Sequence, residues 1–313
     1  MSVLSQMKDH NGNEIKRGKA DVNGIRIHYG IAGSGPLVML LHGVPKTMYF
    51  WRKVIPLLTP HYTVLTPDIR GFGDSERPSS GYDTRTIAED LAQLVTALGY
   101  DRFRVVGEDW GAAMAYAVAA HHRDRVDQLI YQEMLLPGLG WEKGPESRSS
   151  ALKKWDTRNL WHLNFFSVPD YPEMLIAGKE KPFWSTWMKS EMYDPGAVTD
   201  EELDEYVRWM SSPGGLRTIF EIYRASEEDA EQNQKQFKKK LEMPVLAVGG
   251  KHFFAEEVHH QMNQVAENVR GVILDKGHNL ALECPEELAK EYLRFFDEVT
   301  ESHRSIPVAQ EQR

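Results

Sequence analysis

The chain has 313 residues, of which 41% are hydrophobic and 27% are charged, so it is long enough for one large globular domain with an insertion. Its net charge of -9 argues against nucleic acid and against an anionic membrane as partners, because both call for a clustered positive surface. Cys284 is the only cysteine, which excludes an internal disulfide and is compatible with a reducing compartment. Neither an apolar signal segment nor a membrane-spanning window is found in the sequence, so we expect a cytoplasmic protein.

Two antiparallel edge strands are predicted first, one at residues 19–28 and one that leads into a turn at residues 33–36. Short apolar strands then alternate with helices. The strands are expected at residues 37–41, 62–66, 103–106, 128–131, 245–248 and 271–274. A helix from Thr86 ends at Gly99, and Thr86 with Glu89 is predicted to form its capping box. The alternation predicts an α/β fold in which helices cover both faces of a parallel sheet.

The alternation stops between about residues 137 and 236, where the sequence becomes helix-like and rich in tryptophan. The tryptophans of this segment are Trp141, Trp155, Trp161, Trp184, Trp187 and Trp209. Packing explains any single one of them, but the set is also what an apolar substrate pocket needs. The segment follows the sixth strand, where a sheet of this type opens its crevice. We therefore divide the chain into a core of residues 1–136 and 237–313 and a helical cap, or lid, of residues 137–236.

The pentapeptide Gly107-Glu108-Asp109-Trp110-Gly111 follows an apolar strand and opens a helix-forming run. This is the arrangement of a nucleophile elbow, with Asp109 where lipases and esterases carry serine. A carboxylate at this place attacks carbon, displaces a leaving group and becomes an ester that water must cleave, so the substrate should hold an electrophilic sp³ carbon. Glu108 adds a second negative charge, which would raise the pKa of Asp109 unless its side chain points away or has a cationic partner.

Four motifs in this order resemble the α/β-hydrolase fold and, within it, the epoxide hydrolases, over about residues 20–297. They are residues 42–45 (His-Gly-Val-Pro), residues 68–75 (Asp-Ile-Arg-Gly-Phe-Gly-Asp-Ser), the Asp109 elbow and Gly277-His278. The resemblance implies a mostly parallel central sheet with an inserted α-helical cap, and a small-molecule epoxide and water as the reactants. It also implies that no cofactor is needed. The sequence shows no metal site either, because its adjacent histidine pairs lack the spacing of ligands on one helix face.

The resemblance assigns His278, after the last strand, as the base that activates water, a task that suits the near-neutral pKa of histidine. Many relatives supply the acid that orients this base after the seventh strand, where residues 249–254 hold none. Glu133, just after the sixth strand, stands at the alternative position used by a subgroup of epoxide hydrolases and by the haloacetate dehalogenases. The other interpretation of Glu133 is a salt bridge at the hinge of the lid.

Two lid segments resemble those of the same subgroup, and they assign His162 and Tyr223 to the pair that binds and protonates the epoxide oxygen. Most epoxide hydrolases use two tyrosines instead, and a hydrogen-bonded core histidine is the other interpretation of His162. The motifs also assign the backbone N–H groups of Val44 and Trp110 to an oxyanion hole, in which one donor is typically worth about 3 kcal/mol.

An apolar or aromatic substrate is expected from the aromatic residues of the elbow and lid. The residues predicted to contact it are Trp110, Trp161, Phe165 and Phe166.

Three hypotheses follow from these residues. The first is an epoxide hydrolase that forms a diol through an ester on Asp109. The second is a dehalogenase with the same nucleophile, in which Trp110 holds the halide; against it, haloacetate enzymes carry a halide-binding tryptophan where Leu163 stands and arginines where Trp110 and Ala113 stand. The third is a ligand-binding protein that has lost turnover, which the intact catalytic set disfavours. A homodimer is left open.

Overall fold

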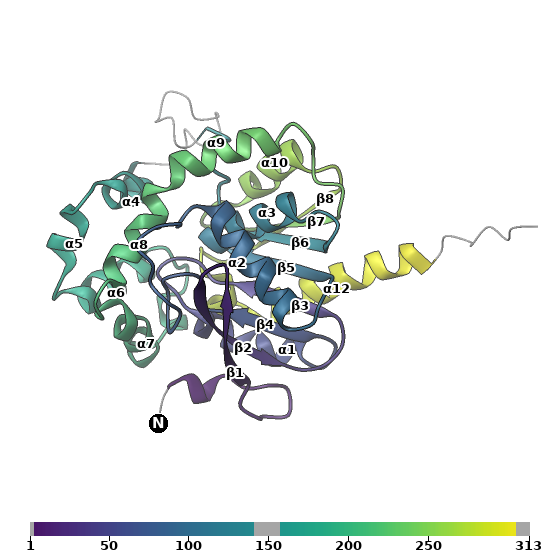
Figure 1. The fold of residues 1–313 in the computed structure, drawn as a ribbon, viewed down its shortest axis with the longest axis horizontal. Coiled ribbons are helices and arrows are strands. Elements are labelled where there is room, and N and C mark those ends of the chain that lie inside the picture. The colour runs from purple at the N-terminus through teal and green to yellow at the C-terminus, as the bar shows by residue number, and fades with distance from the viewer. Residues whose placement is uncertain (1–2, 141–156, 305–313) are drawn as a thin grey trace, which may run out of the picture.

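The computed structural model describes residues 3–140 and 157–304, and an eight-stranded sheet forms the centre of this part of the chain (Figure 1). Trp141 and Trp155, two of the predicted lid tryptophans, lie outside the described residues. The strand order is β1-β2-β4-β3-β5-β6-β7-β8. The strands are β1 Lys16–Val22, β2 Ile25–Ala32, β3 Leu37–Leu41, β4 Thr63–Pro67, β5 Phe103–Glu108, β6 Val126–Gln132, β7 Val245–Gly250 and β8 Val269–Leu274.

All strand pairs from β4 to β8 are parallel, and only β1 with β2 and β2 with β4 are antiparallel. Every residue of β3 and of β4 is buried, as expected for strands that helices cover on both faces. The carboxyl ends of β3, β5, β6 and β7 therefore meet at one edge of the sheet, where this class of sheet opens a crevice.

Two local predictions near the edge of the fold are wrong. Residues 19–28 are not one strand, because Asn23 and Gly24 adopt positive φ values of 45° and 77° and turn the chain between β1 and β2. The capping box of Thr86 and Glu89 does not form either. The helix begins at Thr84, and the carboxylate of Asp83 caps it by accepting a hydrogen bond from the Thr86 N–H at 3.0 Å.

The helices fall into a core group and a group between β6 and β7. The core helices are α1 Ile55–Leu58, α2 Thr84–Ala97, α3 Trp110–His121, α10 Glu256–Val265, α11 Leu280–Glu283 and α12 Pro285–Arg304, with the 3-10 turns η1 Val3–Gln6 and η2 Met48–Lys53. Between β6 and β7 lie α4 Thr157–Ser167, α5 Tyr171–Ile176, α6 Glu180–Ser190, η5 Pro195–Ala197, α7 Asp200–Met210, α8 Gly215–Arg224 and α9 Ser226–Gln236. Figure 1 shows α4 to α8 gathered to one side of the sheet. We call this second group the lid.

Helix α3 begins directly at the elbow and packs against β5 and β6. Its residues 110–120 are all buried and nearly all apolar, which is the pattern of a helix enclosed on every side. Asp109 therefore stands between a strand and a helix that are both embedded in the core, and its position is fixed by the main body of the fold.

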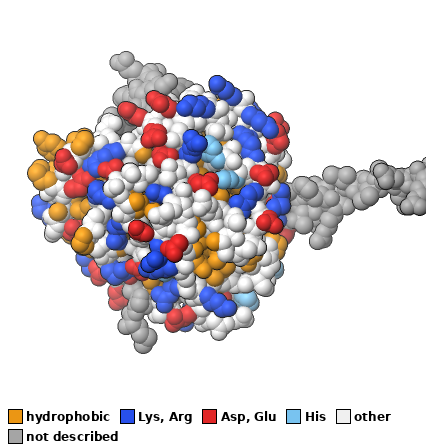
Figure 2. Space-filling model, viewed as in Figure 1, with side chains coloured by type: hydrophobic (Ala, Val, Ile, Leu, Met, Phe, Trp, Pro, Cys, Tyr) orange, Lys and Arg blue, Asp and Glu red, His pale blue; other side chains and the backbone are white. Residues whose placement is uncertain are grey.

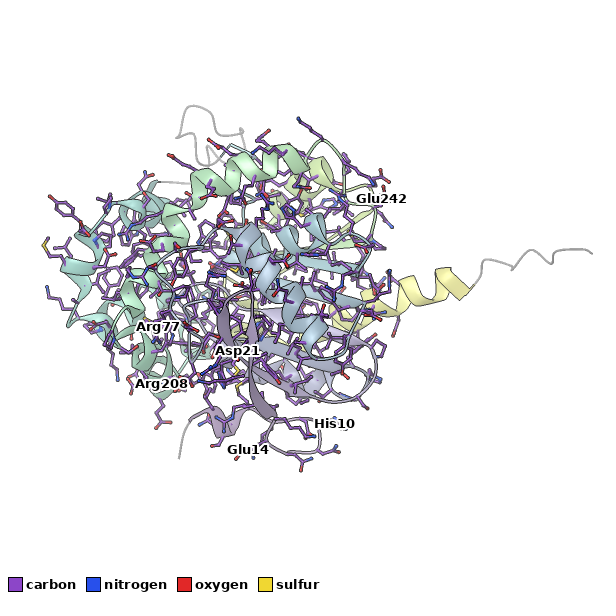
Figure 3. The ribbon with its side chains drawn as sticks, in the orientation of Figure 1. His10, Glu14, Asp21, Arg77, Arg208 and Glu242 are labelled. Atoms are coloured by element: carbon purple, nitrogen blue, oxygen red, sulfur yellow. The ribbon has the colours of Figure 1, made fainter. Side chains whose placement is uncertain are left out.

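Ion pairs join the lid to the core. Arg52 of η2 binds Glu202 of α7 through its Nε at 3.0 Å, and Arg208 of α7 lies 3.4 Å from Asp74. Figure 3 shows Arg208 beside Arg77 at this junction, where Arg77 also donates to the Gly73 carbonyl at 2.9 Å. These contacts hold the lid over the carboxyl edge of the sheet.

Figure 2 shows acidic and basic side chains interspersed over the visible face, in keeping with the absence of a single basic surface from the sequence. Exposed apolar side chains of α5 form a small group at the outer side of the lid: Tyr171, Met174 and Leu175. Within residues 3–140 and 157–304, every helix is too short or too polar to cross a membrane.

Candidate active site

Asp109 stands in the sharp turn between β5 and α3 with a φ of 57° and a ψ of -137°, a conformation that costs energy for a residue with a side chain. Glycines make room for the turn. A Cβ on Gly107 would lie 2.1 Å from the Gly111 carbonyl oxygen, and a Cβ on Gly43 would lie 2.4 Å from the Asp109 Cβ. The strain and the glycines together hold the Asp109 carboxylate at the end of the sheet.

The two oxygens of the Asp109 carboxylate have different partners. Oδ1 accepts hydrogen bonds from the N–H groups of Val44, at 2.9 Å, and Trp110, at 2.6 Å. Oδ2 lies 2.7 Å from Nε2 of His278. One oxygen is thus held by backbone donors in the manner of an oxyanion hole, and the other is held by the imidazole.

Glu133 lies on the far side of the His278 ring, with its Oε2 3.1 Å from Nδ1. Its other carboxylate oxygen accepts a hydrogen bond from the N–H of Gly250 at the end of β7. Glu133, His278 and Asp109 are 0%, 3% and 6% exposed, so the three groups interact in a low-dielectric environment. The structure brings the predicted nucleophile, base and acid into one hydrogen-bonded line, the arrangement of a catalytic triad.

The pKa values of this line follow from its contacts. Burial alone would lower the pKa of His278, but hydrogen bonds to Asp109 and Glu133 and the charge of Glu191 outweigh burial and raise that pKa to about 10. Burial would raise the pKa of Asp109, but the hydrogen bond from His278 and the charges of Lys46 and His278 lower it to about 2. Asp109 is therefore ionised and His278 is protonated before any reaction takes place.

Glu108 has a buried cation as its partner. The Lys46 ammonium, on a side chain that is 2% exposed, lies 3.4 Å from a carboxylate oxygen of Glu108, and Gln132 donates to the other oxygen. Burial still raises the pKa of Glu108 to about 7 in spite of Lys46. The pKa of Asp109 stays low beside it, so the second acid does not neutralise the nucleophile.

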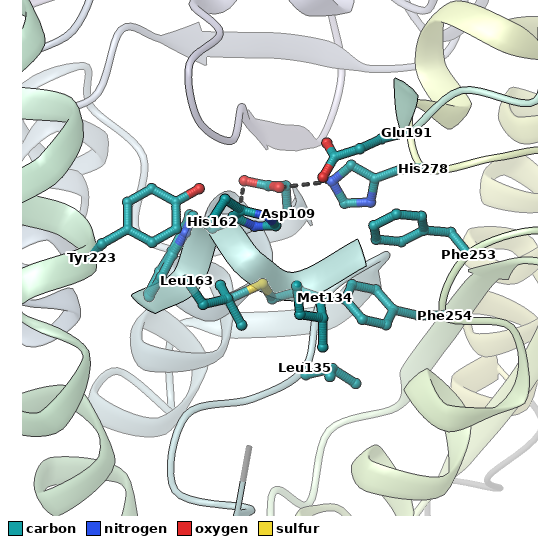
Figure 4. Close-up of a pocket in the computed structure, with 12 residues that line it drawn as sticks. Asp109, Met134, Leu135, His162, Leu163, Glu191, Tyr223, Phe253, Phe254 and His278 are labelled. Atoms are coloured by element: carbon teal, nitrogen blue, oxygen red, sulfur yellow. Dashed lines mark hydrogen bonds and ion pairs between the residues drawn. The ribbon is translucent and has the colours of Figure 1, made fainter. Parts of the chain in front are cut away.

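His162 of α4 and Tyr223 of α8 face each other in the lid, with ring centroids 6.0 Å apart and nearly perpendicular planes. The Tyr223 ring also packs edge to face on Trp110, at 5.3 Å. Burial, followed by the charges of Asp109 and Glu191, raises the pKa of Tyr223 well above its ordinary value, so the phenol keeps its proton. Figure 4 shows both lid residues directed toward the Asp109 carboxylate.

A cavity lies between these lid residues and the line of Asp109 and His278 (Figure 4). Its polar wall consists of Asp109, His162, Glu191, Tyr223 and His278. Its remaining wall is apolar and consists of Trp110, Met134, Leu135, Leu160, Leu163, Phe253 and Phe254. The lining is that of a pocket for a small apolar molecule with one reactive polar group.

Three of the predicted substrate contacts are not brought into this wall. Trp161 is 43% exposed, and neither Phe165 nor Phe166 lines the cavity. Phe166 is fully buried inside the lid, with its ring centroid 5.4 Å from that of Trp184 and 5.8 Å from that of Trp187. These aromatic residues pack the lid itself, which was the simpler interpretation of any single one.

The sequence reasoning missed several residues of the site. Phe253 and Phe254 supply the aromatic wall next to His278, with the ring of Phe253 4.4 Å from the imidazole. They follow β7 in a segment that was considered only for its lack of an acid. Glu191 and Lys46 carry no local motif, and only the fold brings their charges close to Asp109. Within the described residues no group of three or more potential ligands could hold a metal ion.

The family described as alpha/beta hydrolase fold matches residues 36–285. A soluble epoxide hydrolase from Corynebacterium sp. (strain C12) is 36% identical over 90% of this chain and 98% of its own length. The solved structure of the epoxide hydrolase CorEH without ligand has a TM-score of 0.84 and 36% identity, covering 91% of this chain and all of that chain. A fluoroacetate dehalogenase from Burkholderia sp. is 27% identical over 88% of this chain and 92% of its own.

The chain belongs to the alpha/beta hydrolase fold family. The predicted fold class, with its mostly parallel sheet, and the predicted resemblance to the epoxide hydrolases are confirmed. The chain is a hydrolase.

Proposed function

We propose that this hydrolase opens an apolar or aromatic epoxide to a vicinal diol through an ester on Asp109. The observation that carries the proposal is the arrangement across the cavity: an ionised carboxylate on one wall and two potential proton donors, His162 and Tyr223, on the opposite wall. A three-membered ether ring needs both, because its carbon is attacked while its oxygen gains a proton. The lid division at residues 137–236 and a cytoplasmic location remain predictions, and a homodimer stays open.

The first half-reaction uses the oxygen that the backbone leaves accessible. Oδ2 of Asp109 attacks a ring carbon, the carbon–oxygen bond of the ring breaks, and its electron pair goes to the ring oxygen, which takes a proton from Tyr223 or His162. Oδ1 stays with the N–H groups of Val44 and Trp110 and becomes the carbonyl oxygen of the ester. Asp109 does not have to lose a proton before it attacks, because its lowered pKa keeps the carboxylate ionised.

The second half-reaction requires His278 to change from an acid to a base. Its pKa is high because Asp109 is charged and hydrogen-bonded to it, and formation of the ester removes that charge. The pKa of His278 should then fall, and its proton replaces the one that the lid donor gave to the ring oxygen. The neutral imidazole can then take a proton from water while Glu133 orients it. Water attacks Cγ of Asp109, and the N–H groups of Val44 and Trp110 stabilise the oxyanion.

A dehalogenase is the second candidate, since the same nucleophile serves it and Trp110 lines the cavity. Two observations weigh against it. Leu163 lines the cavity where haloacetate enzymes carry a halide-binding tryptophan, and no arginine is among the described residues of the wall, so a haloacid would have no cation for its carboxylate. A halide also leaves as a stable anion and has no use for two proton donors.

Parallel incubation with styrene oxide, a haloalkane and fluoroacetate tests the proposal. We expect diol from styrene oxide and no halide from fluoroacetate. The Asp109→Ala variant is the control for spontaneous hydrolysis. Halide release with no diol would replace the proposal by the dehalogenase, and binding without either product would favour a protein that has lost turnover.

A further inference from the structure

Glu191 is a lid carboxyl that the steps above leave without a role. It caps the C-terminus of α6, is 9% exposed and lines the cavity. Figure 4 shows its carboxyl group directed toward the His278 imidazole and the Asp109 carboxylate. Apart from the nucleophile, it is the only carboxyl in the described wall of the cavity. Burying a carboxyl group at this position lowers the stability of the fold, so a functional role would account for its presence.

The backbone around Glu191 is built against the loop that carries the base. The N–H of His278 donates to the Glu191 carbonyl oxygen at 2.9 Å. Gly277 makes the contact possible, because a Cβ there would lie 2.7 Å from that same oxygen. Glu283 of α11 binds both sides, accepting from the N–H of Tyr193 at 2.9 Å and from that of Gly277 at 3.2 Å. The lid segment and the loop of the base therefore hold a fixed geometry.

The charges that face Glu191 come from four different elements of the core. Burial raises its pKa to about 7; His278 and Lys46 lower that pKa, and Asp109 and Glu133 raise it. When Asp109 becomes an ester, the loss of its negative charge favours the ionised form of Glu191, and the loss of the His278 proton opposes it. With a pKa of about 7, Glu191 can accept a hydrogen bond from a water O–H as a carboxylate at neutral and alkaline pH.

We propose that Glu191 positions the hydrolytic water: its carboxylate accepts a hydrogen bond from one O–H of the water while His278 takes the proton of the other. The water oxygen is thereby aimed at Cγ of Asp109. As the tetrahedral intermediate collapses, the bond between Cγ and the alkyl oxygen breaks, and the diol oxygen takes the proton from His278. The regenerated Asp109 carboxyl gives its proton to His278, which restores the starting ion pair. This inference rests on the proposed ester mechanism.

Single-turnover kinetics with styrene oxide separate the two half-reactions. Glu191→Gln keeps the size of the side chain and the backbone bond to His278, and removes the charge. We expect ester formation to stay within about twofold of wild type and ester hydrolysis to slow on the order of 10-fold, the difference between a charge-assisted and a neutral hydrogen bond. The ester should accumulate in a rapid-quench mass spectrum. Glu191→Asp should recover part of the rate.

The matched control is Glu201→Gln, which removes one exposed acid from the lid helix α7 and should change neither step. The pH profile of ester hydrolysis should lose one titration in Glu191→Gln and keep it in the control. Unchanged hydrolysis in Glu191→Gln would overturn the inference, and so would an equal loss in both steps, which a merely structural role produces. Absence of any ester in wild type would instead remove the proposed function.

Discussion

Replacing the buried Lys46 with methionine tests how the charge of Lys46 stabilises the buried carboxylate of Glu108. Lys46 is 1% exposed, and methionine keeps most of its length without the charge that lies 3.4 Å from Glu108. Removing one partner of a buried ion pair typically costs about 3–5 kcal/mol. Glu108 can avoid most of that cost by binding a proton, because its pKa is already raised to about 7.

The loss of stability in Lys46→Met should therefore depend on pH. Lys46 lowers the pKa of Glu108, so its removal raises that pKa further above the unfolded value. A raised pKa gives stability that is complete below the unfolded pKa and is lost as pH rises through the folded one. Near pH 6 Glu108 is mostly protonated with or without Lys46. From about pH 7 to pH 9 the added loss should grow by about 1.4 kcal/mol per pH unit, to about 3 kcal/mol.

Urea unfolding near pH 6 and pH 9 measures this difference, with Lys290→Met as the matched exposed control. The double variant Lys46→Met with Glu108→Gln should recover most of the stability lost at the higher pH, because neither charge is then left alone. Removing Lys46 also raises the pKa of Glu191, which adds to the pH-dependent loss of stability. An equal loss at both pH values, or a double variant no more stable than the single one, would refute the reasoning.

Three further predictions concern the chemistry. Asp109→Ser should fold normally, as circular dichroism can check, and form no diol; a freshly purified variant with full activity would end the ester mechanism. His278→Gln should form the ester and fail to cleave it, so a quenched sample should gain the mass of the substrate, whereas unmodified inactive protein would assign His278 another role. Tyr223→Phe and His162→Phe should each slow ester formation on the order of 10²-fold, with non-additive losses in the double variant. Wild-type rates of ester formation in both would contradict their assignment as donors.

The elbow and the order of the core elements could be predicted from the sequence because their signals are local. A strand, a turn between glycines and an apolar helix follow one another directly around Asp109, and the structure has each of them. Glu133 could be predicted only through the resemblance, since nothing next to it in the chain indicates that β6 and β7 bring it to His278.

The buried pair of Lys46 and Glu108 shows what local patterns leave out. The two residues follow β3 and end β5, which are parallel neighbours in register at Leu41 and Gly107. Their proximity is therefore a result of strand order, and it could have been predicted only after the order was known. The sequence indicated that Glu108 needs a cationic partner unless its side chain points away. Only the fold shows that Lys46, in the loop after the neighbouring strand β3, is that partner.

The lid was the part least open to prediction. Its aromatic content indicated an apolar interior, but composition does not say which ring faces the substrate and which faces another helix. Trp161 is half exposed and Phe166 is enclosed by other lid rings. Glu191 has no motif at all, and it reaches the site only because Gly277 lets the lid backbone approach the loop of the base.

The charges around the cavity distinguish Asp109, the proposed nucleophile, from the other acids. Asp109, Glu108, Glu133 and Glu191 lie close together, while Lys46 and His278 are the cations that act on them within the described residues. Burial raises the pKa of the other three acids; only Asp109 has its pKa lowered, because the hydrogen bond from His278 and the charges of Lys46 and His278 outweigh its burial. Negative charge is therefore concentrated on the oxygen that faces the cavity. Esterification removes the negative charge that keeps the pKa of His278 high, so formation of the ester itself should prepare His278 to take a proton from water.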